Sequence, residues 1–88
     1  KDKPDHVEVR LANRHHHLEH LNNLGDRIYA AGPTIAADGE TMNGSVLIID
    51  FPDRKAAEDF ADADPYAKAG LFESVDISAW KKVLPLEK

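Results

Sequence analysis

The chain has 88 residues, of which 42% are hydrophobic and 31% charged, which suits one small globular domain over residues 1–88 and excludes a collagen-like, low-complexity or wholly disordered chain. Eleven Lys and Arg against 16 Asp and Glu give a net charge of −5, opposite in sign to a nucleic-acid-binding or membrane-binding surface, so we expect neither partner. The absence of Cys excludes a disulfide framework, a zinc–thiolate site and a thiol nucleophile. The longest apolar run, Val46 to Ile49, is too short to cross a bilayer, and no signal-peptide core follows the charged start, so we expect a cytoplasmic protein.

The first predicted element is a helix from Val7 to Leu24, a stretch without Pro or Gly. Pro4-Asp5 offers an N-terminal cap, and Gly25 suits the C-terminal position that tolerates a positive φ. Arg27 to Ala31 then predicts a short strand, which Gly32-Pro33 closes because Pro lacks the N–H that a ladder needs.

A loop from Ile35 to Asn43 leads to a predicted central strand from Ser45 to Phe51. Its continuous run of β-branched and aromatic residues indicates burial on both faces. Pro52 stops this strand, and Asp53 can cap a second helix that runs to about Ala63.

Asp64-Pro65-Tyr66 ends the second helix, and a turn of helix from Ala67 to Gly70 follows. The alternating apolar residues from Ser74 to Val83 predict a last strand, and the tail from Leu84 to Lys88 is expected to be loose. The order α, β, β, α, β indicates an α+β fold, an antiparallel sheet with two helices on one face. A ferredoxin-like βαββαβ unit would begin with a strand, which Lys1 to Lys3 is too short to supply.

On a helical wheel His17 lies within the apolar stripe of the first helix, beside Leu21 and Leu24. Arg10 and Arg14 fall in the same stripe, which breaks the binary pattern expected of a buried face. Such violations often mark functional sites, because a buried charge costs several kcal/mol unless it is paired. The alternative is that both Arg residues reach the rim or pair with some of the carboxylates.

Two further sets of residues have competing interpretations. His15, His16, His17 and His20 have the spacing of helix-borne metal ligands, but no H-E-x-x-H pattern and no Cys accompany them, so we expect no physiological metal site. Asp64 precedes Pro65, and an Asp in that position usually starts a turn or caps the next helix. From the sequence alone the capping role of Asp64 is the favoured one.

Several short motifs follow one another along nearly the whole chain. They are Asp2-Lys3-Pro4, Arg14 with His17-Leu18, Gly32-Pro33, Gly44-Ser45, Asp62-Ala63-Asp64-Pro65-Tyr66, Ala69-Gly70-Leu71, Ile77 and Trp80-Lys81-Lys82-Val83. Each is weak alone, but in this order and spacing they resemble the YCII-related domain, a family of small bacterial proteins in the dimeric α+β barrel superfamily.

The resemblance implies a ferredoxin-like fold that forms a homodimer with the two sheets facing each other and a pocket in each subunit. It places a His–Asp pair of the active site on His17 and Asp64. Ser45 and Gly32-Pro33 become pocket walls, with Tyr66 beside them. It also implies a first strand ahead of Asp2-Lys3-Pro4, which this sequence does not carry.

A His side chain exchanges a proton near neutral pH, and a carboxylate on its other nitrogen fixes its tautomer. The sequence has no nucleophile elbow, P-loop or dinucleotide fingerprint, so we expect no cofactor. Relatives in the superfamily include lyases and isomerases, which implies acid–base proton transfer, elimination or isomerisation on a small anionic, aromatic-derived metabolite. Arg10 or Arg14 would hold the anion. The alternative is a non-catalytic domain that binds a metabolite or dimerises as an accessory to another enzyme.

Overall fold

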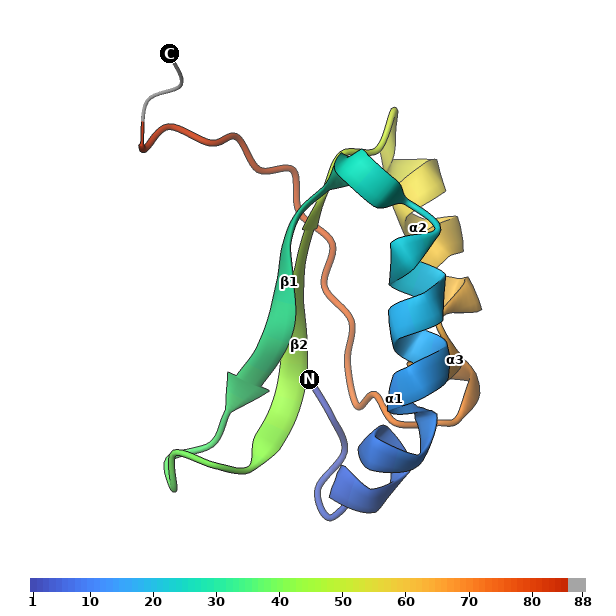
Figure 1. The fold of residues 1–88 in the computed structure, drawn as a ribbon, viewed down its shortest axis with the longest axis vertical. Helices are drawn as coiled ribbons and strands as arrows, with labels where there is room; N and C mark the ends of the chain where they lie inside the picture. The colour runs from blue at the N-terminus through green and yellow to red at the C-terminus, as the bar shows by residue number, and fades with distance from the viewer. Residues whose placement is uncertain (86–88) are drawn as a thin grey trace.

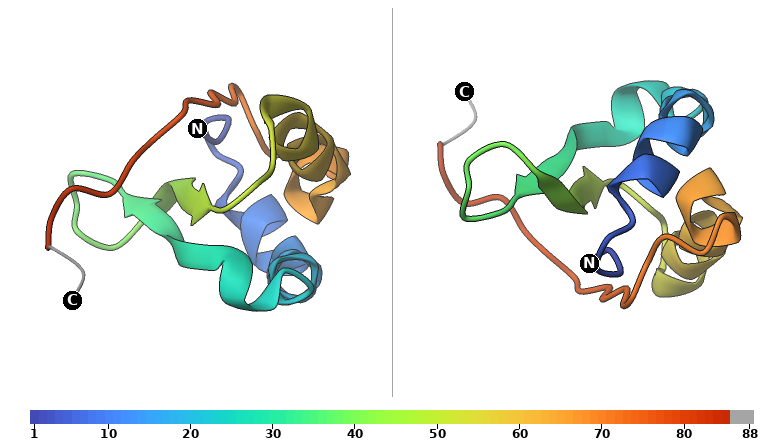
Figure 2. Two further views of the ribbon diagram at one scale, coloured as in Figure 1. Left: turned by 90° about the horizontal axis from the view of Figure 1, so that it is seen from above. Right: turned by 90° about the horizontal axis from the view of Figure 1, so that it is seen from below.

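The computed structural model describes residues 1–85, so most of the predicted loose tail lies outside the described residues. A hairpin of two strands lies on one side and the helices lie on the other, as two further views confirm (Figures 1 and 2). The elements in chain order are α1 (Val7–Asn22), the 3-10 turn η1 (Gly25–Arg27), β1 (Ile28–Ile35), β2 (Met42–Ile49), α2 (Arg54–Ala63) and α3 (Pro65–Lys68).

Helix α1 begins and ends differently from the prediction. His6 is its N-cap residue and no side chain caps it, so Pro4-Asp5 does not provide the cap. Asp5 instead has a φ of +59°, a turn conformation that Asp tolerates better than most residues. The helix ends at Asn22, and Gly25, with a φ of +56°, begins η1.

Strand β1 runs antiparallel to β2, with Ile28 opposite Ile49 and Ile35 opposite Met42. Pro33 lies inside β1 opposite Ser45, so the prediction that Gly32-Pro33 closes this strand was wrong. In the two-stranded sheet β1 is an edge strand, where a missing N–H can face away from the ladder. The connecting loop is correspondingly shorter than predicted, covering residues 36–41.

The first three residues connect the hairpin to the chain after α3. The Asp2 amide donates to the Asn43 carbonyl at 3.0 Å, and the Lys3 amide donates to the Leu71 carbonyl at 2.8 Å. Asp2 also forms an isolated antiparallel bridge with Phe72. Residues 1–3 therefore lie where a first strand of a ferredoxin-like βαββαβ order belongs, although they are too few to form a ladder.

The prediction of a last strand over residues 74–83 was wrong. This segment is extended, but no β-ladder joins it to any described residue. Its first residue, Ser74, exchanges backbone hydrogen bonds with Lys1. Further along, Arg54 Nη1 donates to the Ile77 carbonyl at 2.8 Å, and Trp80 meets the ring of Tyr29 edge-on. Alternating apolar residues predict an extended backbone, but a strand also needs a neighbour within hydrogen-bonding distance.

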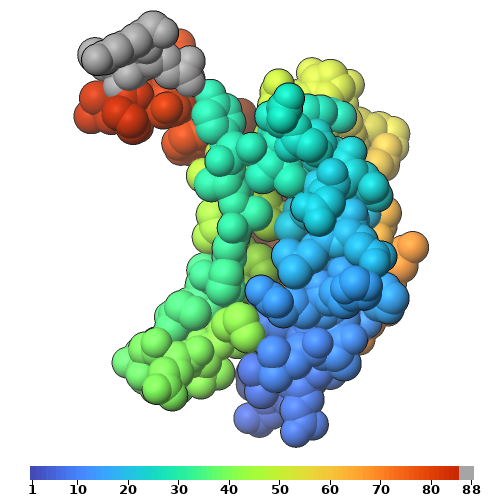
Figure 3. All heavy atoms as spheres, viewed as in Figure 1, coloured from blue at the N-terminus to red at the C-terminus, as the bar shows by residue number. Residues whose placement is uncertain are grey.

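The interior is small and unusually polar. Among residues 1–85 only three large apolar side chains are buried, Leu21, Tyr66 and Leu71, and four charged or titratable residues are buried with them, Asp2, Arg10, His17 and Asp64. Strand β1 is exposed along almost its whole length, whereas β2 is mostly half-buried; the loop end of the hairpin forms the lower left corner of the molecule (Figure 3). The exposed large apolar side chains are Leu11, Leu18, Tyr29, Ile35, Val46, Val75, Trp80, Val83 and Leu84.

The start of α2 provides a test of local stability. Asp53 caps this helix as predicted, accepting a hydrogen bond of 2.8 Å from the Ala56 amide. Replacing Asp53 with Ala removes that acceptor, so we expect the free energy of unfolding to fall by about 1 kcal/mol in urea titrations. Asp62→Ala, an exposed position within the same helix, is the control and should not destabilise the protein. Equal losses in both variants would contradict the capping role.

Candidate active site

His17 and Asp64 meet in the interior although 47 residues separate them. His17 Nδ1 lies 2.9 Å from Asp64 Oδ1 and 3.0 Å from Oδ2, and the two residues are 6% and 2% exposed. His17 comes from the buried stripe of α1, while Asp64 lies at the junction of α2 and α3. The helices thus bring together the two residues that the sequence nominated for catalysis.

Asp64 also caps α3. Its Oδ1 accepts a hydrogen bond of 2.9 Å from the Tyr66 amide. The capping role and the contact with His17, which were alternatives in the sequence, therefore coexist in one carboxylate. The cap holds the carboxylate in place, so His17 meets a partner whose position does not depend on His17 itself.

The geometry assigns the tautomer of His17. An ionised carboxylate only accepts hydrogen bonds, so neutral His17 carries its hydrogen on Nδ1 and has its lone pair on Nε2. Among the described residues the hydrogen bonds of His17 involve Nδ1, and no fully buried side-chain nitrogen or oxygen lacks a partner. Nε2 is therefore not completely sealed from solvent, although the residue is only 6% exposed. A neutral imidazole in this tautomer can accept a proton at Nε2.

Tyr66 covers the imidazole. Its ring stacks on His17 with 3.9 Å between centroids and 13° between planes. Burial raises the pKa of the Tyr66 hydroxyl, while the positive charges of Arg10 and Arg14 oppose that rise. Tyr66 is therefore a neutral, largely apolar wall at pH 7.

Arg10, one of the two residues expected to hold a substrate anion, is engaged by neighbouring residues of the protein. Its Nε and Nη2 donate to the two carboxylate oxygens of Asp2 at 2.7 and 3.0 Å, and Nη2 also donates to Ser45 Oγ at 2.8 Å. Its Cζ lies 4.8 Å from the centroid of the Tyr66 ring. Pairing of Arg10 with a carboxylate was one of the two alternatives, but in the sequence nothing distinguishes Asp2 from the other 15 acidic residues.

Arg14 is exposed, although the helical wheel placed it in the apolar stripe. It lies on α1 between Arg10 and His17, and it makes no hydrogen bond or ion pair with a described residue. Its charge is close enough to act on the Tyr66 hydroxyl. Of the two Arg residues nominated from the sequence, Arg14 is the one whose guanidinium is available to a ligand.

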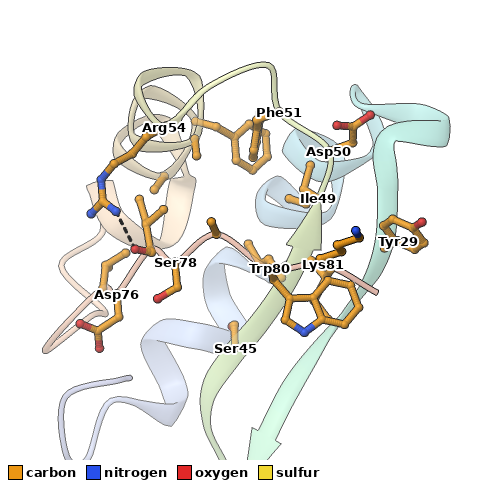
Figure 4. Close-up of a pocket in the computed structure, with 18 of the residues that line it drawn as sticks. Tyr29, Ser45, Ile49, Asp50, Phe51, Arg54, Asp76, Ser78, Trp80 and Lys81 are labelled. Atoms are coloured by element: carbon orange, nitrogen blue, oxygen red, sulfur yellow. Dashed lines mark hydrogen bonds between the residues drawn. The ribbon is translucent and has the colours of Figure 1, made fainter. Parts of the chain in front are cut away.

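A cavity of about 960 Å³ lies between β2, α2 and the extended segment over residues 74–83 (Figure 4). Ser45 and Asp64 both line it. Gly32 and Pro33 are exposed on β1 and do not line it, so the structure does not bring them to this part of the site. His17 and Tyr66 lie outside its lining, with Asp64 between them and the cavity.

The His residues of α1 do not gather around a common point. His15 pairs with Glu19 on the surface at 2.7 Å. His20 stacks on Phe60, and its Nε2 lies 3.0 Å from the Phe60 carbonyl. Within residues 1–85 no three His, Asp or Glu side chains are close enough to hold a metal ion together. None of the helices in that part of the chain could span a membrane.

The chain is similar in sequence to a family of known proteins over nearly its whole length. The model of the YCII-related domain matches residues 1–81. Protein YciI of Escherichia coli O6:H1 is 41% identical, and the match covers 94% of this chain and 92% of that protein. An uncharacterized protein of Haemophilus influenzae is 39% identical over the same fractions.

A solved structure is also similar. It is that of 5-chloro-2-hydroxyhydroquinone dehydrochlorinase from Burkholderia phenoliruptrix AC1100, in complex with 2,5-dihydroxybenzoquinone. It shares 36% identity and a TM-score of 0.86 with this chain, over 92% of this chain and 87% of the other. The predicted α+β, ferredoxin-like fold is confirmed by this similarity together with the observed order of elements.

The tautomer of His17 can be measured directly. In the wild-type protein we expect ¹⁵N NMR of the imidazole to show a hydrogen on Nδ1 at a pH where the ring is neutral. In Asp64→Asn the amide can either accept from or donate to Nδ1, so we expect the Nε2–H tautomer to become populated. Asp62→Asn, on the exposed side of α2, should leave the spectrum of His17 unchanged. A wild-type Nε2–H tautomer would contradict the assignment.

Proposed function

The chain belongs to the YCII-related domain family, and we propose that it is a small enzyme that needs no cofactor and catalyses proton transfer on a small, anionic, aromatic-derived metabolite. The observation that supports this most strongly is the buried contact between His17 and Asp64 that leaves Nε2 able to accept a proton. A similar protein of known structure is a 5-chloro-2-hydroxyhydroquinone dehydrochlorinase, an enzyme that acts on a small aromatic-derived molecule.

In the proposed reaction His17 Nε2 takes a proton from the substrate and the ring becomes an imidazolium. Asp64, held by the α3 cap, keeps Nδ1–H oriented and stabilises the positive charge. Returning the proton to another atom of the substrate gives isomerisation. Departure of a leaving group with its bonding electrons gives elimination, and the proton then leaves to water.

Arg14 is proposed to attract the anionic group of the substrate. The protein as a whole carries a net charge of −5, so an anion needs a local positive charge to approach. Arg14 supplies that charge next to Tyr66 and within two turns of α1 from Arg10 and His17. Ser45 accepts a hydrogen bond from Arg10, so its own hydroxyl hydrogen can be donated to a ligand.

We also propose that the protein acts as a homodimer. Nine large apolar side chains are exposed on the described chain, while only three are buried. The sheet contributes three of them, Tyr29, Ile35 and Val46, and of these Tyr29 lines the cavity. Exposed apolar side chains that gather on a surface often mark an interface, and a second copy placed on the hairpin would cover side chains such as Val46.

Replacing His17 with Gln tests the proposed base. The probe is 5-chloro-2-hydroxyhydroquinone, with chloride release as the readout, followed by a panel of small aromatic acids and lactones. We expect turnover to fall by about 100- to 10,000-fold, because general base catalysis contributes that much. His16→Gln, exposed on the same helix, is the control and should retain turnover. A fully active His17→Gln would refute the proposal. Saturable binding by the wild type without product would favour the alternative of a binding domain.

Arg14→Gln tests the anion site separately. Arg14 is exposed and unpaired, so the variant should fold normally. We expect a higher KM with a smaller change in kcat, because the charge is proposed to act in binding. Raising the salt concentration should weaken binding by the wild type and have less effect on the variant. Identical KM values in both proteins would remove Arg14 from the site.

The dimer is tested by sedimentation equilibrium. The wild type should have twice the mass of the 88-residue chain. Val46→Asp places a charge on the exposed face of β2 and should shift the protein to monomer, whereas Glu40→Gln in the hairpin loop should not. A monomeric wild type at micromolar concentration would refute the homodimer.

A further inference from the structure

A buried ion pair between Asp2 and Arg10 lies beside the proposed dyad and takes no part in it. Both side chains are only 4% exposed. Removing two charges from water is costly, and a buried pair of apolar residues is often as stable as a buried ion pair. Stability alone therefore does not explain why these charged residues occupy the interior.

Contacts lead from this pair to His17. Arg10 lies over the Tyr66 ring at 4.8 Å, and the same ring stacks on His17 at 3.9 Å. Arg10 and His17 are seven residues apart on α1, so they lie on one face of the helix two turns from each other. Tyr66, from α3, contacts both of them.

The orientation of the His17 imidazole depends on its stacking against Tyr66 as well as on its hydrogen bond to Asp64. The last side-chain torsion of His is broad, so a hydrogen bond at Nδ1 fixes one atom but leaves the ring free to tilt about it. Stacking on Tyr66 fixes the plane of the ring and hence the direction of Nε2. The Tyr66 ring also has a broad torsion, and it is held by Arg10 and by the edge contact with Phe72 at 6.1 Å.

We infer that Arg10 is a positioning residue: anchored by Asp2 and Ser45, it holds the Tyr66 ring flat against His17 and so directs Nε2 toward the substrate. The planar fork of Arg suits this role, because it bonds both Asp2 oxygens and Ser45 while its face lies near the aromatic ring. Asp2 balances the charge of Arg10 within the interior. The catalytic meaning of the inference rests on the proposed function, whereas the contacts of Tyr66 and His17 can be measured without it.

The test removes both charges together. Arg10→Met combined with Asp2→Leu fills the same space without leaving one buried charge unpaired. In this double variant we expect the His17 ring protons to lose the upfield ring-current displacement that Tyr66 causes in the wild type, with Tyr66→Leu as the reference for complete loss. With 5-chloro-2-hydroxyhydroquinone as probe, we expect kcat to fall by about 100-fold with little change in KM, as a misdirected base predicts. The matched control, Lys55→Met with Asp59→Leu, removes an exposed pair on α2 and should change neither readout.

Two results would overturn the inference. One is that the His17 ring protons of the folded double variant keep the chemical shifts they have in the wild type. That result rules out the positioning role of Arg10 whether or not the probe is turned over. The other is a lost displacement together with unchanged chloride release. If the double variant does not fold, Arg10→Lys replaces it. An ammonium carries its donors on one atom and has no planar face to lie along the Tyr66 ring, so a partial loss of displacement is expected, and full retention would again overturn the inference. The proposed function fails separately, through an active His17→Gln.

Discussion

The hydrogen bonds of the Asp64 carboxylate are the interactions on which both the packing of the helices and the candidate site depend. The carboxylate accepts one hydrogen bond from the Tyr66 amide at the start of α3 and another from Nδ1–H of His17 on α1. One residue thus joins two helices and sets the tautomer of the imidazole. Because the cap fixes the carboxylate, the site is organised before any substrate arrives, which is the condition for efficient acid–base catalysis.

A polar interior is the second constraint on this chain. Asp2, Arg10, His17 and Asp64 are buried in two satisfied pairs, and few apolar side chains accompany them. Each pair is tolerable only while both partners remain, because a buried group that loses its partner bears the full cost of desolvation. The interior therefore contains less apolar surface than is usual, and its charged groups are held in fixed positions. Such departures from the usual pattern of burial are common at functional sites.

Among local features, Asp53 caps α2 and the turn after Asp64 is helical, as expected, whereas Pro4-Asp5 does not cap α1. Further errors arose where a distant neighbour decides the conformation. Pro33 continues an edge strand, and residues 74–83 join no ladder although their alternation is that of a strand. Strand pairing depends on which backbone lies alongside, and a single sequence does not record it.

The sequence by itself determined that α1 carries His17 and Arg10 on its inward face, because helical periodicity places residues without reference to the rest of the chain. It also singled out Asp64, and the resemblance to a family joined it to His17. Only the tertiary structure decided that Asp2 neutralises Arg10, that Tyr66 stacks on His17, and that Arg14 stays exposed. These outcomes depend on distances between segments far apart in the chain, and such distances are set by packing rather than by local preference.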